Sequence, residues 1–190
     1  MVRMADVLAA FAVVFLAELG DKTQLVALTL AGRYPALKVM AALGAAIVVL
    51  QTLSVTAGAL ISRAVPERGI AVGAGVLFLG FAVWTWRSAD EGDEDDATAA
   101  GAAGLLSVAV AFFLAELGDK TMLTTAGLAA DRGAVPVWIG SLGAMLAATA
   151  LAVVAGKALT TRVPPRTLRR IGAVAFAVVG TLTLVSAAAG

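Results

Sequence analysis

Long apolar runs separated by short polar breaks are the dominant pattern in this chain of 190 residues. Each run is close to the roughly 20 residues that a helix needs to cross the hydrocarbon core of a bilayer. None has the period-two alternation that is typical of membrane barrel strands. The pattern predicts an all-α polytopic membrane protein with six transmembrane helices, at residues 5–30, 37–61, 69–86, 105–130, 136–160 and 170–188.

Composition supports the membrane interpretation. The chain is 61% hydrophobic and 14% charged, against about 25% charged residues in a typical soluble domain. An Ala-rich soluble bundle would need polar helical faces, which long stretches of this chain lack. A net charge of +1 gives no indication of nucleic-acid binding. The first run resembles a signal peptide, but it continues through Glu18 and Asp21 without a small-residue cleavage site, so we expect a membrane helix there.

A nine-residue sequence, FLAELGDKT, occurs at 15–23 and again at 113–121. Between the two copies, residues 88–104 (SADEGDEDDATAAGAAG) are acidic and small, which is typical of a linker. We therefore predict a first three-helix repeat at 1–87, a linker at 88–104 and a second three-helix repeat at 105–190. Because each half has an odd number of spans, the second is inverted relative to the first, an arrangement common among secondary transporters.

The basic residues at the predicted span ends indicate the orientation. Eight Lys and Arg residues lie on the side that carries the acidic linker, and four lie on the opposite side. The excess of positive charge faces the cytoplasm in most membrane proteins. We therefore expect the linker in the cytoplasm and both termini outside, with the protein in the inner (cell) membrane of a bacterium.

Four carboxylates lie deep inside the first and fourth predicted spans. Glu18 and Glu116 are near the centres of their runs, and Asp21 and Asp119 follow three residues later. On a continuous helix, residues three apart share one face. A charge at the bilayer centre costs at least ~2.5–3.5 kcal/mol, so such residues usually have a function. In an inverted repeat, the two acidic pairs can meet near the midplane.

Lysines and glycines accompany these acids. Lys22 and Lys120 each follow a glutamate by four residues, a spacing that favours an ion pair within one helix. Gly20 and Gly118 allow close helix approach, local unwinding or an exposed carbonyl ligand, and the sequence does not decide between them. If the ion pairs only joined helices, Asp21 and Asp119 would have no explanation.

The charges of the two motifs indicate the substrate. Four carboxylates and two ammonium groups sum to −2, which a divalent cation would neutralise. The chain has neither Cys nor His, so hard cations such as Mg²⁺, Ca²⁺ and Mn²⁺ fit best. Crowded, desolvated carboxylates also favour protonation, which predicts metal–proton exchange by alternating access. The metal would be the substrate, so we expect no cofactor. A cation channel and a Na⁺-coupled exchanger remain alternatives.

Intramembrane aspartyl proteases use a Gly-x-Gly-Asp motif, whereas Glu18 stands at the first glycine position here, so we expect no enzyme. The repeated ELGDKT is similar to the Glu-x-Gly-Asp-(Lys/Arg)-(Ser/Thr) signature of a cation-exchanger family. That family includes eukaryotic Golgi Ca²⁺/Mn²⁺:H⁺ antiporters, bacterial manganese exporters and a chloroplast manganese transporter. The resemblance covers the whole chain and implies export of the metal from the cytoplasm. It implies that the cation-binding acids are Glu18, Asp21, Glu116 and Asp119, with Gly20, Lys22, Thr23, Gln24, Gly118, Lys120 and Thr121 as supporting motif residues.

The second motif departs from the first at one position, where Met122 replaces the equivalent of Gln24. Met122 either packs in the protein interior or places a soft thioether near the site, favouring Mn²⁺ over Ca²⁺. Polar residues in spans two and five, Gln51 among them, either line the pathway or hydrogen-bond between helices. The sequence leaves open the choice between Mn²⁺ and Ca²⁺, the coupling ion and whether the protein forms a homodimer.

Overall fold

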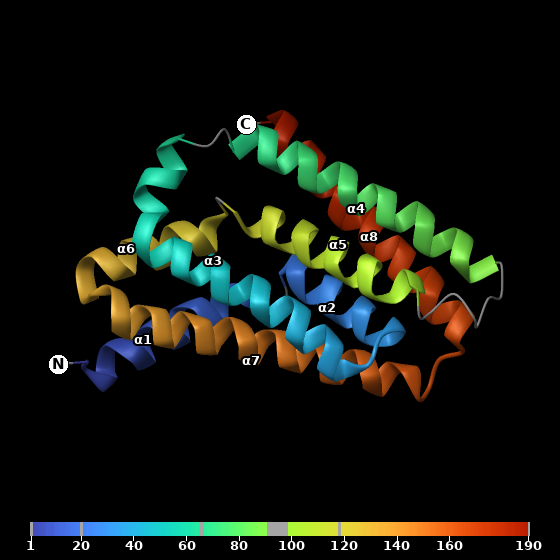
Figure 1. Ribbon diagram of the computed structural model, residues 1–190, viewed down its shortest axis with the longest axis horizontal. Coiled ribbons are helices and arrows are strands. Elements are labelled where there is room, and N and C mark those ends of the chain that lie inside the picture. The colour runs from blue at the N-terminus through green and yellow to red at the C-terminus, as the bar shows by residue number, and fades with distance from the viewer. Residues whose placement is uncertain (1, 20, 65–66, 91–98, 118, 190) are drawn as a thin grey trace.

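The computed structural model describes residues 2–19, 21–64, 67–90, 99–117 and 119–189 (Figure 1). These residues form eight helices and no strand, which confirms the all-α prediction. The helices are α1 (Met4–Glu18), α2 (Lys22–Arg33), α3 (Ala36–Ala64), α4 (Glu67–Asp90), α5 (Ala99–Glu116), α6 (Lys120–Arg132), α7 (Ala134–Thr160) and α8 (Pro165–Ala189).

Two of the six predicted helices are each divided in two. The run at 5–30 forms α1 and α2, and the run at 105–130 forms α5 and α6. The predicted continuous helices are therefore wrong at the motifs, and local unwinding, one of the alternatives, occurs there. Helices cover both ends of the predicted linker at 88–104, because α4 continues to Asp90 and α5 begins at Ala99. Residues 91–98 of that linker lie outside the described residues.

Proline and glycine set several of the other helix ends. Pro35 stands between α2 and α3, and Pro165 is the first residue of α8, where its missing N–H costs no helical hydrogen bond. Gly133, between α6 and α7, has φ +93°. A side chain would be strained in that conformation, so glycine allows the chain to reverse there within one residue.

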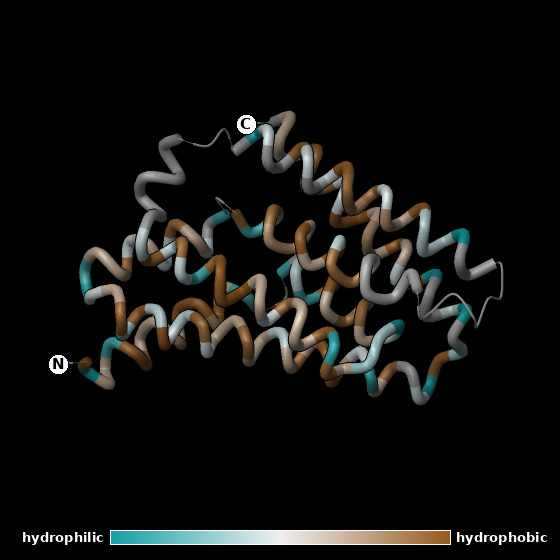
Figure 2. Tube along the Cα trace, viewed as in Figure 1, coloured by the Kyte–Doolittle hydropathy of each residue, from teal (hydrophilic) through white to brown (hydrophobic). Residues whose placement is uncertain are grey.

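Within the described part of the chain, three helices contain runs long and apolar enough to cross a membrane, namely Ala36–Thr56, Ala134–Leu159 and Arg170–Ala188. Shorter apolar segments occur at Gly75–Arg87 in α4 and at Gly104–Glu116 in α5. Large aliphatic side chains are exposed on many helices, for example Leu16 and Val154 at 68% and 66% exposure. In Figure 2, apolar stretches occupy most of the helix lengths, and many hydrophilic positions lie near helix ends. This surface suits contact with lipid rather than water.

Successive passes of the chain alternate in direction along the long axis of the molecule (Figure 1). α1 and α2 run one way, α3 returns, α4 follows the first direction, α5 and α6 return, and α7 and α8 repeat the alternation. The unbroken helix α7 packs against both α1 and α2, while α3 packs against both α5 and α6. Each long helix therefore supports the two parts of the broken helix from the other half of the sequence.

Glycines allow the closest of these contacts. At Gly140 in α7, an added Cβ would collide with the backbone oxygen of Val7 in α1. At Gly156, it would lie 2.5 Å from the backbone oxygen of Leu28 in α2. The missing side chains thus let α7 approach the backbones of both helices.

The helices α4 and α8 form a separate close pair. A Cβ on Gly75 would lie 2.6 Å from the Leu184 side chain, and one on Gly180 would lie 2.9 Å from the backbone oxygen of Gly75. Nearby, the rings of Phe78 and Phe176 stack with their centroids 6.2 Å apart. The glycine contact and the aromatic pair fix the register of these two helices.

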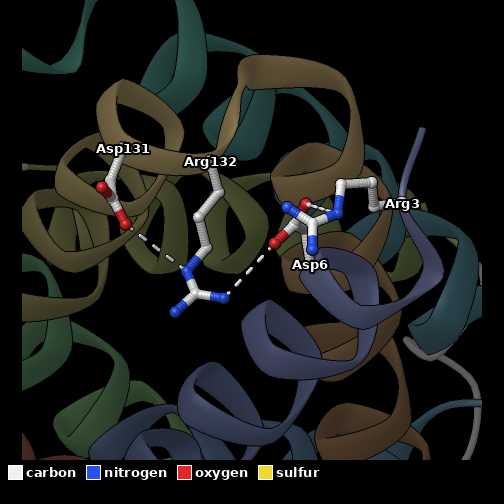
Figure 3. Close-up of polar contacts among 4 residues, drawn as sticks. All are labelled: Arg3, Asp6, Asp131 and Arg132. Carbon is white, nitrogen blue, oxygen red and sulfur yellow. Dashed lines mark hydrogen bonds and ion pairs between the residues drawn. The ribbon is translucent and has the colours of Figure 1, made fainter. Parts of the chain in front are cut away.

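An arginine fastens the C-terminal end of each short helix that follows a break. The Arg132 guanidinium at the end of α6 lies 3.3 Å from the Asp6 carboxylate in α1, beside Arg3 and Asp131 (Figure 3). At the end of α2, the Arg33 guanidinium lies 4.4 Å from the centroid of the Trp84 ring in α4 and donates a 2.8 Å hydrogen bond to the Thr85 hydroxyl. The two short helices are therefore anchored to different neighbours.

Candidate metal centre

The described residues of the two motif copies follow the same pattern of helix end and helix start. In the first, Glu18 is the last residue of α1, and Asp21 is extended (φ −75°, ψ 164°) just before α2. In the second, Glu116 ends α5 and Asp119 is extended (φ −71°, ψ 168°) just before α6. In both, the aspartate N–H donates a 3.1 Å hydrogen bond to the glutamate carbonyl. The repeated sequence therefore produces the same helix break twice.

This backbone corrects two predictions about the motif. Glu18 and Asp21 do not share a helix face, and neither do Glu116 and Asp119, because each pair flanks a break. For the same reason, no single helix carries Lys22 together with Glu18, or Lys120 together with Glu116. Gly20, Gly118 and the side chains of both lysines lie outside the described residues.

Three of the four predicted carboxylates nonetheless converge. Glu18, Asp21 and Glu116 each offer an oxygen, and these oxygens all lie within 4.8 Å of one another. Glu18 and Glu116 are 2% and 0% exposed, and Asp21 is half-buried. Two of these residues belong to the first half of the sequence and one to the second. Oxygens this close could act together as ligands of one cation.

Asp119 stands beside this group of three. It is half-buried, and its charge acts on Glu18 together with that of Asp21. Neither Asp21 nor Asp119 uses its side chain to cap the helix that follows. The backbone N–H groups at the start of α2 and α6 also place partial positive charge at the breaks, which favours anionic groups there.

Threonines of both motifs hold the Glu18 carboxylate. Thr121 donates a 2.7 Å hydrogen bond from the second half to Glu18 Oε1, and Thr23 donates a longer one of 3.3 Å to Oε2. Both threonines are buried. The Thr121 hydroxyl therefore links the two halves of the sequence at the carboxylate cluster.

The remaining motif residues lie next to this cluster in sequence. Gln24 is half-buried, and Met122 is 1% exposed within α6. One residue that sequence reasoning missed is Thr125, which is completely buried. Its position four residues after Thr121 was the available signal, because that spacing puts both hydroxyls on one helix face.

Known proteins with similar sequences identify the family. A sequence profile described as "Divalent cation/proton antiporter GDT1" matches residues 6–93 and 104–190. The chain belongs to this family. The match confirms the resemblance drawn from the two motifs, and it makes this GDT1 member a transporter rather than an enzyme. As an antiporter with apolar helices of spanning length, it is an integral membrane protein with divalent cations and protons as its class of substrates.

Individual relatives agree with the family match. The "GDT1-like protein 5" of Arabidopsis thaliana is 29% identical over 212 residues, which cover 92% of this chain and 93% of the relative. A "Putative manganese exporter" of Vibrio cholerae is 31% identical over 166 residues, covering 86% and 82%. A GDT1-like protein of Synechocystis is 32% identical over 182 residues, covering 84% and 86%. No solved structure is significantly similar to this GDT1 member.

Proposed function

We propose that this protein exchanges Mn²⁺ or Ca²⁺ for protons, exporting the metal from the cytoplasm, at a site formed by Glu18, Asp21, Glu116 and Asp119. The observation that carries the proposal is the approach of Glu18, Asp21 and Glu116 to within 4.8 Å of one another. Membership of a family of divalent cation/proton antiporters supports the same reaction class.

The chemistry of exchange follows from the crowded carboxylates. When no metal is bound, close negative charges in a low dielectric repel one another, and protonation relieves that repulsion. A divalent cation neutralises two of the charges and displaces the protons. The metal ion and the protons therefore exclude each other from the site. This competition couples metal movement in one direction to proton movement in the other.

Hard oxygen ligands determine the choice of metal. With neither Cys nor His in the chain, the site suits Mn²⁺ and Ca²⁺ better than zinc or copper. The Vibrio cholerae relative, whose name describes a manganese exporter, favours Mn²⁺ and the outward direction. The metal is cargo in this scheme, and the protein needs no resident cofactor.

The architecture that we propose for transport has six spans in two inverted halves, 1–87 and 105–190, with each broken helix counting as one span. The alternating directions of the passes in Figure 1 support it. So do the contacts of α7 with α1 and α2, and of α3 with α5 and α6, because each long helix packs on the broken helix of the other half. Ion sites in such transporters are formed by discontinuous helices at the repeat interface. Alternating access would then move one half relative to the other, in a monomer or within each subunit of a homodimer.

The orientation that we propose has both termini outside the inner membrane of a bacterium and the acidic linker in the cytoplasm. Because the chain has no native cysteine, single cysteines can report it. A membrane-impermeant thiol reagent added to intact cells should label Arg3→Cys and leave Thr161→Cys unlabelled. The reverse labelling pattern would show the opposite orientation.

The decisive experiment measures Mn²⁺ and Ca²⁺ flux in proteoliposomes with and without a pH gradient. We expect saturable, gradient-driven flux that Glu18→Gln and Glu116→Gln abolish. The matched control is Lys38→Gln, which removes the charge of an exposed side chain near the start of α3, away from the carboxylates. Flux that ignores the pH gradient would refute proton coupling, a Na⁺ gradient as the driving force would show a Na⁺-coupled exchanger, and non-saturating flux would show a channel.

A further inference from the structure

In the described part of the chain, the completely buried side chains of Gln51 and Thr125 have polar atoms without a partner. Among the described residues, neither amide atom of Gln51 in α3 nor the hydroxyl of Thr125 in α6 has a hydrogen-bond partner. Both residues are 0% exposed. The buried Ser54 hydroxyl of α3 differs from them, because it donates a hydrogen bond to the Leu50 carbonyl at 2.8 Å. Buried polar groups are nearly always satisfied, so these three atoms indicate a polar ligand from outside the chain.

Thr125 lies close to the carboxylate cluster. It follows Thr121 by four residues on α6, so both side chains point from the same face of that helix. The Thr121 hydroxyl donates a 2.7 Å hydrogen bond to Glu18, so this face of α6 is directed toward the carboxylates. Thr125 is one turn farther along, about 6 Å at 1.5 Å per residue.

Gln51 reaches the same level from the neighbouring helix. α3 packs along α6, and the two run in the same direction (Figure 1). Val55, one turn after Gln51, packs against the small apolar cluster that contains Ala129, which is one turn after Thr125. Gln51 and Thr125 each lie one turn before Val55 and Ala129 on helices that run in the same direction, so we infer that they lie alongside each other. The three unpartnered atoms thus lie between the carboxylates and this cluster, which consists of Ala10, Ala129 and Val137.

Beyond that apolar cluster, the molecule becomes polar again. Here Arg132 forms its ion pair with Asp6 (Figure 3), which lies near the N-terminal end of α1. These two residues, with Arg3 and Asp131, help to line a hollow of about 850 Å³. From the carboxylates toward the N-terminal end of α1, the surroundings change from carboxylates to neutral polar groups, then to a thin apolar layer and finally to an open charged hollow.

We propose that Gln51 and Thr125 form a neutral relay site for the transported divalent cation, which holds the ion and some of its water between the carboxylates and the N-terminal end. The proposal rests on the proposed function. The amide oxygen and the hydroxyl are hard ligands, and the amide N–H groups can hold an oxygen of the hydration shell. A site without net charge binds the ion weakly enough to release it, which is a requirement for movement through any pathway.

The test uses the full-length protein with Mn²⁺ as the probe. Gln51→Leu and Thr125→Val remove the polar atoms at nearly constant volume, so we expect both variants to fold. Mn²⁺ binding at equilibrium should stay within about twofold of wild type, because the carboxylates are intact. Turnover in proteoliposomes should fall roughly tenfold in each variant, the scale of one lost hydrogen bond to a charged partner. Gln51→Glu should instead tighten Mn²⁺ binding while slowing turnover, because it adds a charge at the relay site.

The matched control is Thr56→Val on the same helix. The Thr56 hydroxyl is exposed and donates to the Thr52 carbonyl at 2.6 Å, so turnover should remain at the wild-type rate. Wild-type turnover in both Gln51→Leu and Thr125→Val would overturn the proposal and leave a structural water only. Equal losses of binding and turnover would also overturn it, because they would place both residues in the primary site. Failure of the wild-type protein to exchange Mn²⁺ for protons would refute the proposed function instead.

Discussion

The hydrogen bond from Thr121 to Glu18 offers a sharp test of the carboxylate site. Thr121→Val replaces the hydroxyl with a methyl group of similar size at a position that is 1% exposed, so no cavity forms. Glu18 Oε1 then loses a donor from the other half of the molecule. The companion variant Thr23→Val removes the second donor to the same carboxylate.

The two distances predict unequal effects. The 2.7 Å contact of Thr121 is at the optimum for an O–H···O bond, whereas the 3.3 Å contact of Thr23 lies beyond the usual range. Hydrogen bonds to a charged group contribute about 1.5–3 kcal/mol, and neutral ones about 0.5–1.5 kcal/mol. We assign roughly 1.5–2 kcal/mol to Thr121 and about 0.5 kcal/mol to Thr23. At ~1.4 kcal/mol per factor of ten, Mn²⁺ affinity should fall roughly tenfold to thirtyfold in Thr121→Val and about twofold in Thr23→Val.

The assay is equilibrium Mn²⁺ binding to purified protein, in which electron paramagnetic resonance reports the free ion. Thermal unfolding without metal checks that both variants remain folded. An effect of Thr23→Val equal to or larger than that of Thr121→Val would refute the reasoning from distance. Unchanged affinity in both variants would show that Glu18 does not ligate the ion in this arrangement.

Three further predictions concern packing and selectivity. Gly75→Ala places a methyl group 2.6 Å from Leu184 and should cost about 1–3 kcal/mol in thermal unfolding; Gly73→Ala, with nothing within 4 Å of its Cβ, is the control and should cost nothing. Arg33→Lys loses the stacking on Trp84 at 4.4 Å and should destabilise by about 1 kcal/mol, which an unchanged melting temperature would contradict. Met122→Gln should leave the ratio of Mn²⁺ to Ca²⁺ affinity unchanged if Met122 only packs, whereas a lower ratio would identify the thioether as a ligand.

The sequence indicated that Glu18 and Glu116 are buried, because a charge inside a long apolar run is easy to locate, and both side chains are buried in the structure. The approach of Glu18, Asp21 and Glu116 agrees with the expectation drawn from the repeat, in which inverted halves would bring matching positions together. The breaks were one alternative among several. An average of hydropathy over a window contains no information on backbone dihedral angles. Leu19 has an extended ψ of 117° and ends the helix, although the apolar run continues on both sides of the motif.

Other features depend on contacts that no linear pattern contains. The Thr121 bond to Glu18 requires α6 to face the end of α1, which is set by packing of both against other helices. Thr125 was missed for a related reason. A buried threonine in a membrane helix usually bonds to its own backbone, and only the packed structure shows that the Thr125 hydroxyl does not.

The glycines of α7 have a consequence for motion. An ion carrier that opens to each side in turn must shift parts of its interior, and interlocked side chains oppose such shifts. At Gly140 and Gly156, the carbonyls of Val7 and Leu28 face no side chain of α7. The surface of α7 is therefore smooth at its closest contacts with α1 and α2, and no side chain there blocks sliding. A side chain at either point would collide with these carbonyls and force α7 away from α1 or α2, so we expect it to slow transport.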